Sequence, residues 1–333
     1  EQLIHAVVSH GYGLVNNVKP ENNMEKVLAI VGPTAVGKTN LSIDIAKKFN
    51  GEIISGDSMQ VYQKLDIGTA KVTVEEMQGI PHHLIDTKTI HDRFSAADFK
   101  ETAQKLISEI SQRGKLPIVV GGTGFYLQAL LRDLELGGSN EDRNQIEAIR
   151  AELNQKENDE LLSILKTIDL ATYENIDRKN RRRIIRAIEV FKVSGQKMSE
   201  QQMQPTAVYD DLLIGLNTER SILYQRINHR VNTMLDAGLE NEARWLFDET
   251  KVPQANKGIG YREWQGYFEN EKTLSETIEL IQKDSRHYAK RQLTWFRNKM
   301  DVNWYDIIQN PQEQAKIYQK IENWLGVKNE LER

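Results

Sequence analysis

Residues 32–39 read Gly32-Pro33-Thr34-Ala35-Val36-Gly37-Lys38-Thr39, which matches the phosphate-binding pattern G-x-x-x-x-G-K-[ST]. Glycines in such a loop let consecutive backbone N–H groups turn inward, and the N-terminus of the following helix adds partial positive charge. Lys38 supplies a full charge, and Thr39 is placed to bind Mg²⁺. The pattern predicts a site for a di- or triphosphate but does not identify the reaction.

The segments on either side supply the context that this loop needs. Val27–Val31 is a short β-rich run that leads into the loop, and Lys38–Lys48 is predicted to be a helix. Glu52–Ser55 predicts a second strand. With a strand before it and a helix after it, the motif is poorly explained as a chance glycine turn.

The same alternation continues along the chain. Ser95–Asp98 forms a capping box, after which apolar residues recur on one helical face up to Ile110. Gly114 is predicted to close that helix, and Leu116–Val120 is a third buried strand. Strands that alternate with helices predict an α/β fold, here a P-loop NTPase-like core with a parallel sheet flanked by helices.

The character of the sequence changes between Gly137 and Gln204, where no apolar strand appears and the segment is polar, charged and helical. Strand character resumes at Leu212–Leu216 and returns once more at Val302–Tyr305. We therefore predict an all-helical insertion over residues 137–205, within a core formed by 24–136 and 206–333. Residues 1–23 are expected to be a leader of uncertain role that lacks signal-peptide features, with Met24 as the functional start.

Composition limits the possible classes of protein. The 333 residues contain no cysteine, which excludes disulfides and thiolate zinc sites and fits a cytoplasmic protein. No run of eighteen apolar residues exists, so no membrane span is expected. The seven histidines show no metal-binding spacing, and we expect a monomer. A net charge of −4 argues against a basic nucleic-acid binder as a whole, but it leaves room for local basic patches.

Phosphoryl transfer is the usual function of a phosphate-binding loop, yet some of its parts are missing. The chain has no N/T-K-x-D guanine motif, and Leu116–Val120 ends in Gly121–Gly124 instead of a plain aspartate. Asp57 follows the second strand, where small-molecule P-loop kinases often place a carboxylate. Both such a kinase and a nucleotide-switched RNA-binding module without chemistry therefore remain alternatives.

Several segments, read together and in order, resemble the tRNA dimethylallyltransferases. They are GPTAVGKT at Gly32–Thr39, DSMQVYQKLDIGTAK at Asp57–Lys71, PHHLID at Pro81–Asp86, FSAADF at Phe94–Phe99, GGTGFYLQAL at Gly121–Leu130, NRRRIIRAIEV at Asn180–Val190, GIGYRE at Gly258–Glu263 and KRQLTWFR at Lys290–Arg297. The resemblance implies transfer of a dimethylallyl group from its diphosphate to the exocyclic amine of adenosine 37 in tRNA. The loop would then hold the diphosphate as a leaving group, with Mg²⁺ on Thr39.

The resemblance also implies roles for three residues. Asp57 looks like the family's catalytic carboxylate, which orients the poorly nucleophilic amine and takes its proton; the alternative is an aspartate that only caps a turn. Thr123 resembles the threonine that hydrogen-bonds the oxygen bridging the allyl group to the diphosphate, although it could serve only the glycine turn. Arg230 matches a diphosphate contact and shares a helical face with Arg226.

The resemblance further implies contacts with the anticodon stem-loop, and the candidate residues fall in five segments. The target base should be extruded into a cavity above the phosphate loop, where Gln60 has an amide suited to reading adenine and Met59 could equally fill the core. Basic clusters on helices suit phosphate contacts, although a charged run is usually only a solvated face. The candidates are Asp57, Ser58, Met59 and Gln60; Arg143; Arg182, Arg183 and Arg186; Lys257, Gly258, Ile259, Gly260, Tyr261 and Arg262; and Lys290, Arg291, Gln292, Leu293, Thr294, Trp295, Phe296 and Arg297.

Overall fold

A computed structural model describes residues 24–134, 136, 143–200 and 207–327. Its core is a six-stranded sheet in which every pairing is parallel and the strand order is β3-β2-β4-β1-β5-β6. The strands are β1 (Lys26–Val31), β2 (Gly51–Ser55), β3 (His82–His83), β4 (Leu116–Gly121), β5 (Asp210–Leu216) and β6 (Asn303–Tyr305). The predicted parallel sheet is therefore confirmed.

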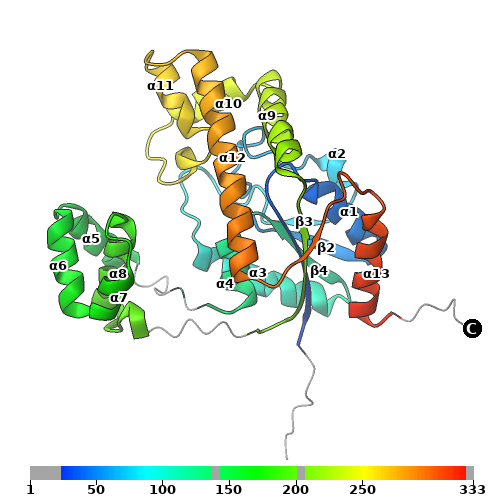
Figure 1. Cartoon of the computed structure of the whole chain (residues 1–333), viewed down its shortest axis with the longest axis horizontal. Helices are drawn as coiled ribbons and strands as arrows, with labels where there is room; N and C mark the ends of the chain where they lie inside the picture. The colour runs from blue at the N-terminus through cyan, green and yellow to red at the C-terminus, as the bar shows by residue number, and fades with distance from the viewer. Residues whose placement is uncertain (1–23, 135, 137–142, 201–206, 328–333) are drawn as a thin grey trace, which may run out of the picture.

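The helices follow the strands in the alternating order that the sequence predicts (Figure 1). Around the sheet they are α1 (Lys38–Lys48), α2 (Val74–Met77), α3 (Ala96–Gln112), α4 (Gly124–Leu131), α9 (Arg220–Asp236), α10 (Leu239–Asp248), α11 (Gln265–Phe268), α12 (Leu274–Lys299) and α13 (Glu313–Leu325). Short 3₁₀ turns at Ala255–Lys257 and Arg262–Trp264 join α10 to α11. The predicted capping box forms at the start of α3, and Gly114, with a φ of 71°, follows its last turn.

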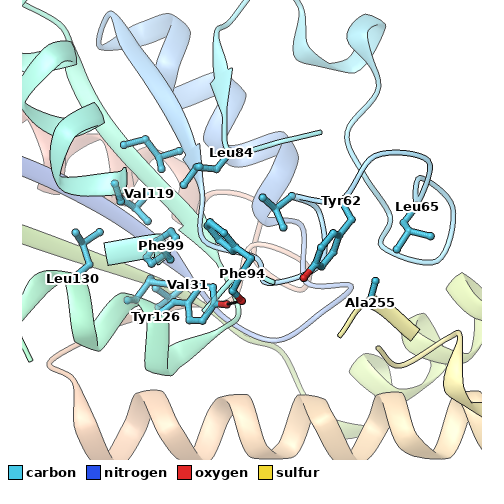
Figure 2. Packing of buried hydrophobic residues seen from close by; sticks show 14 of the residues in the cluster. Val31, Tyr62, Leu65, Leu84, Phe94, Phe99, Val119, Tyr126, Leu130 and Ala255 are labelled. Carbon is cyan, nitrogen blue, oxygen red and sulfur yellow. Dashed lines mark hydrogen bonds between the residues drawn. The ribbon is translucent and has the colours of Figure 1, made fainter. Parts of the chain in front are cut away.

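Side chains of β1 alternate between the two faces of the sheet, as the period of a strand requires. Val27, Ala29 and Val31 belong to a core shared with α3, α4 and α12, whereas Leu28 and Ile30 belong to a second core shared with α1 and α13. Figure 2 shows the first core, where the rings of Phe99 and Tyr126 stack with centroids 4.8 Å apart. Helices therefore cover both faces of the sheet.

The helical segment between α4 and β5 has a hydrophobic core of its own. It comprises α5 (Arg143–Asn154), α6 (Asn158–Ile168), α7 (Leu170–Asn175) and α8 (Arg181–Ser194), followed by a 3₁₀ turn at Met198–Glu200. Leu161, Leu165, Ile184 and Ile188 are fully buried within it. Figure 1 shows these helices as a group to one side of the sheet. The exact domain boundaries remain a prediction.

Two expectations from the sequence concern the histidines at β3 and the first 23 residues. His82 and His83 form β3 itself instead of preceding a strand, and His83 Nε2 lies 2.8 Å from the Glu52 carboxylate, in keeping with a structural role. The leader predicted at residues 1–23 lies outside the described residues. Within the described ranges, no helix is both long and apolar enough to cross a membrane.

Candidate active site

A cavity of about 800 Å³ opens at the carboxyl ends of β1, β2 and β4. Six segments that are far apart in the sequence line it: the phosphate loop, the loop after β2, the glycine turn after β4, the 3₁₀ turns around residues 257–262, helix α9 and helix α12. The carboxyl ends of the strands in a parallel sheet all lie on the same side of the sheet, which is why the loops that follow the strands meet there. The geometry brings together most of the residues predicted from the sequence.

The phosphate loop closes around its own lysine. Lys38 Nζ donates hydrogen bonds to the carbonyl oxygens of Gly32 (2.9 Å) and Pro33 (2.6 Å). Burial, with a smaller contribution from Arg230, lowers the pKa of Lys38 from 10.5 to about 7, although the Asp57 carboxylate raises it. A diphosphate beside this ammonium would offset both unfavourable effects.

This depressed pKa predicts a pH dependence of diphosphate binding. If a bound diphosphate raises the pKa of Lys38 back toward 10.5, binding takes up a proton above pH 7. Affinity should therefore fall as pH rises above 7, by up to about tenfold per pH unit. Calorimetric titration with pyrophosphate between pH 6 and 9 measures this slope. Lys38→Arg provides the control, since pyrophosphate titrates in the same way but the arginine stays charged; equal slopes would contradict the prediction.

Asp57 lies in the loop directly after β2, where it accepts hydrogen bonds from a turn and interacts with two cations. Its Oδ1 accepts the backbone N–H groups of Met59 (2.7 Å) and Gln60 (3.2 Å), so the residue does stabilise a turn. Its charge also raises the pKa of both Lys38 and Arg230, which places the carboxylate near the two cations. The turn uses Oδ1, and no hydrogen bond to Oδ2 occurs within the part of the chain that the structure describes. The catalytic role stays a prediction.

The glycine turn after β4 is held against α12. Gln292 is buried; its Nε2 donates to the Gly122 carbonyl (3.1 Å) and its Oε1 accepts the Thr34 N–H (3.2 Å). A Cβ on Gly122 would lie 2.0 Å from Gln292 Nε2, so a side chain at this position would break the contact. Gln292 therefore fixes the phosphate loop relative to the glycine turn.

Thr123 follows Gly122 in this turn. Its hydroxyl oxygen is buried, and no partner meets full hydrogen-bond geometry in the described ranges, although the Tyr288 side chain lies beside it. Burial and the Asp57 charge raise the pKa of Tyr288 to about 12, while polar contacts with Thr123 and Gln292 lower it. Thr123 is not among the residues that line the cavity, so its contact with a substrate oxygen stays a prediction.

Helix α9 brings two arginines to the phosphate loop. Arg226 Nε donates to the Ala35 carbonyl (2.8 Å), and both Arg226 and Arg230 line the cavity. Burial lowers the pKa of Arg230, Asp57 raises it and Arg226 lowers it further. Because a guanidinium remains charged in a protein, Arg230 adds a fixed positive charge beside Lys38.

The sequence also matches a known protein family. A family model described as IPP transferase matches residues 60–299, well over half of the chain. The chain belongs to the IPP transferase family. The tRNA dimethylallyltransferase of Pediococcus pentosaceus is 98% identical over 310 residues, which cover 93% of this chain and all of that relative. The enzyme of the same name from Ligilactobacillus salivarius is 51% identical, over 90% of this chain and 99% of its own length.

Solved structures agree with this assignment. The tRNA isopentenylpyrophosphate transferase from Bacillus halodurans is 45% identical, with a TM-score of 0.69 over 92% of this chain and 99% of its own. A eukaryotic dimethylallyltransferase acting on tRNA is 29% identical, with a TM-score of 0.78 over 93% of this chain and 82% of that one. The P-loop NTPase-like fold of this IPP transferase is therefore confirmed, and nothing in the comparisons supports the kinase alternative.

The candidate RNA contacts of this IPP transferase differ in exposure. Phe296 is fully buried in the core, so its side chain offers no surface to RNA, whereas Gln292 is buried and hydrogen-bonded to the glycine turn but lines the cavity. This corrects the prediction of Phe296 as an RNA contact, because α12 packs one face inward and Phe296 lies on that face; Gln292 stays a prediction. Exposed members of the set are Arg182, Arg183, Lys257, Arg262, Lys290, Arg291, Thr294 and Arg297. The side chain of Arg143, which begins α5, lies outside the described residues.

Ion pairs separate the exposed cations further. Arg262 pairs with Asp284 (2.8 Å) and Glu263, and Arg186 pairs with Glu189 within α8. The remaining exposed cations of the predicted set pair with no carboxylate within the part of the chain that the structure describes. They are Arg182, Arg183, Lys257, Lys290, Arg291 and Arg297. These six side chains are the better candidates for phosphate contacts, because no internal ion pair has to be broken.

The residues expected around the target base line the cavity, but they are not all free. Ser58, Met59 and Gln60 lie on its wall together with Ile259. Gln60 Oε1 accepts from Ser55 Oγ (3.2 Å), and its Nε2 donates to the Thr69 carbonyl (3.2 Å). The amide expected to read adenine is thus engaged within the protein. Met59 packs against both the core and Gly258 and also lines the cavity, so its contacts fit both expected roles.

Glu242 on α10 is a residue that sequence motifs did not reveal. Its carboxylate accepts three consecutive backbone N–H groups, those of Asp66, Ile67 and Gly68, at 2.9–3.2 Å. It also accepts the Tyr261 hydroxyl at 2.6 Å, which joins two loops that both line the cavity. No motif marks it, because its backbone partners are residues 66–68, more than 170 positions away.

We expect Glu242→Gln to loosen both loops, because the amide loses the negative charge and presents an N–H group to other donors. The free energy of unfolding should fall by about 1.5–3 kcal/mol, the range for hydrogen bonds to charged groups. The KM for RNA should rise because these loops form the cavity wall. Urea unfolding and steady-state kinetics measure the two effects. Asp248→Asn, at an exposed site on the same helix, is the control; a variant indistinguishable from it would refute the role of Glu242.

Proposed function

We propose that the chain transfers a dimethylallyl group from dimethylallyl diphosphate to the exocyclic amine of adenosine 37 in tRNA, releasing diphosphate. One observation carries this proposal: Asp57, the one carboxylate among the described residues that line the cavity, interacts electrostatically with the cations Lys38 and Arg230, and the cavity is large enough for an extruded base. The relatives named tRNA dimethylallyltransferase support the choice of donor and acceptor. We further propose that the chain acts in the cytoplasm, as a monomer, on the anticodon stem-loop.

Each residue of the site has a separate role in the proposed reaction. The amine nitrogen forms a bond to the allylic carbon while the carbon–oxygen bond to the diphosphate breaks, and the electron pair leaves with the diphosphate. Asp57 orients the amine and accepts its proton, and the free Oδ2 suits this task since Oδ1 holds the turn. Lys38 and Arg230 stabilise the departing negative charge, and the Thr123 hydroxyl donates to the bridging oxygen.

A magnesium site fits this arrangement only together with the substrate. Thr39 is exposed on the first turn of α1 and lines the cavity, and no group of three acidic or histidine side chains in the described ranges could hold a metal alone. Mg²⁺ commonly completes its shell with substrate phosphate oxygens, so Thr39 would hold it with the diphosphate. When bound, the ion supplies positive charge beside the leaving group.

Transfer is tested with an unmodified tRNA transcript carrying adenosines at positions 36–38, with Mg²⁺ and radiolabelled dimethylallyl diphosphate. Label should enter the tRNA, and it should not enter a transcript with guanosine at position 37. A chelator should abolish incorporation if Mg²⁺ is required. Absence of incorporation, together with ATP consumption in the presence of small acceptors, would instead favour a kinase.

A further inference from the structure

An aromatic pair, of which one ring is exposed, lies beside the cavity and has no part in the reaction described so far. Phe125 is the second residue of α4 and remains 38% exposed despite its size. Its ring lies nearly perpendicular to that of Trp295 on α12, with centroids 6.0 Å apart and an interplanar angle of 85°. The two rings form one surface contributed by two helices.

Steric contact with Gly124 determines where the Trp295 indole lies. A Cβ on Gly124 would lie 2.3 Å from Trp295 Cδ1, so the ring rests directly on a backbone that only glycine provides. Trp295 Nε1 is buried without a hydrogen-bond partner among the described residues. Hydrogen bonding therefore does not explain where the indole lies, and a buried donor without a partner is a feature that calls for a functional reason.

The pair lies immediately outside the cavity. Gly122 and Gln292 line the cavity wall, and Phe125 and Trp295 each follow one of them by three residues. Along α12 this spacing is about 4.5 Å, less than one full turn. A nucleotide next to a base inside the cavity would reach this surface without unfolding any element.

The charge around the pair suits a polyanion. Arg291 lies four residues before Trp295 and therefore on the same face of α12; it is exposed, lines the cavity and pairs with no carboxylate in the part of the chain that is described. Aromatic faces interleaved with unpaired cations are the usual means of holding unstacked nucleotides, since every base has a π-face and every link a phosphate. A protein partner that presented only aliphatic side chains to this surface would not need cations beside it.

We propose that Phe125, backed by Trp295, is a stacking platform for the nucleobase adjacent to the adenosine that enters the cavity. This inference rests on the proposed function. Extrusion of one base removes a stacking partner from its neighbour, and the Phe125 ring replaces it. The platform thus compensates part of the cost of opening the loop and places Phe125 among the RNA-binding residues.

Kinetics with an unmodified anticodon stem-loop hairpin test the platform. Phe125→Ala should raise the KM for the hairpin about tenfold, the loss expected from one base–aromatic stack, with the KM for the donor unchanged. Phe125→Leu should recover little, because it restores bulk but no ring, whereas Phe125→Trp should recover most of the affinity. Phe247→Ala removes another exposed aromatic, 42% exposed on α10 and absent from the cavity wall, and should behave as wild type.

Abasic hairpins identify the contact. Two hairpins are used, each lacking one base next to the target adenosine, on its 5′ side or on its 3′ side. On the hairpin that lacks the stacked base, wild type and Phe125→Ala should bind equally well, because the stack is already lost. If the variant remains about tenfold weaker on both abasic hairpins, or equals wild type on the intact one, the platform is refuted. Failure of the wild type to label any RNA would instead refute the proposed function, so the two failures are distinct.

Discussion

Asp57→Asn is expected to lower kcat by about 10²- to 10⁴-fold, the contribution of a positioned general base, while RNA affinity stays nearly unchanged. The asparagine Oδ1 can still accept the N–H groups of Met59 and Gln60, so the turn should persist. Only the charge and the basicity are lost. Donor binding should not weaken, because the variant also removes a negative charge next to the diphosphate.

Single-turnover rates and hairpin binding by the same preparation separate these effects. Asp57→Ala provides the comparison, since it removes both the base and the turn and should add a loss of stability. An Asp57→Asn enzyme that retains wild-type kcat, or one that loses binding and rate equally, would assign Asp57 to the turn alone.

Arg230→Gln is expected to reduce kcat/KM for the donor by about 10²- to 10³-fold, the usual cost of removing one donor aimed at developing charge. Arg230 is partly enclosed near Lys38 and Asp57, where weak solvent screening strengthens its interaction with an anion. The KM for RNA should change little. Pyrophosphate should also become a much weaker inhibitor of the variant.

Arg226 offers a matched comparison on the same face of α9. It is exposed and already donates to the Ala35 carbonyl, so Arg226→Gln should cost much less than Arg230→Gln. Equal effects of the two substitutions on pyrophosphate inhibition would show that Arg230 does not contact the leaving group directly.

The sequence predicted the elements that local patterns determine. The helix at Lys38–Lys48 and the capping box at Ser95–Asp98 were correct because helix signals are encoded within a few residues. The parallel sheet followed from the alternation of strands and helices. The phosphate loop was evident because its glycines and lysine are consecutive.

The remaining features depend on tertiary contacts that no local pattern records. Trp295 and Phe296 are neighbours in sequence, yet only the second is fully buried, because α12 packs along a face that the sequence did not define. Arg186 resembled its exposed neighbours but pairs with Glu189. Glu242 meets loops that are distant in the chain, so its role became visible only in the fold.

Gln292 has a consequence for how the two substrates communicate. Its amide joins the N–H of Thr34 to the carbonyl of Gly122, while Arg291 and Trp295, both proposed to contact or support RNA, lie on the same helix. Any displacement of α12 by one substrate is thereby transmitted to the site of the other. Thermodynamic linkage then requires the effect to be reciprocal: whatever factor the RNA applies to the affinity for the diphosphate, the diphosphate applies to the affinity for RNA.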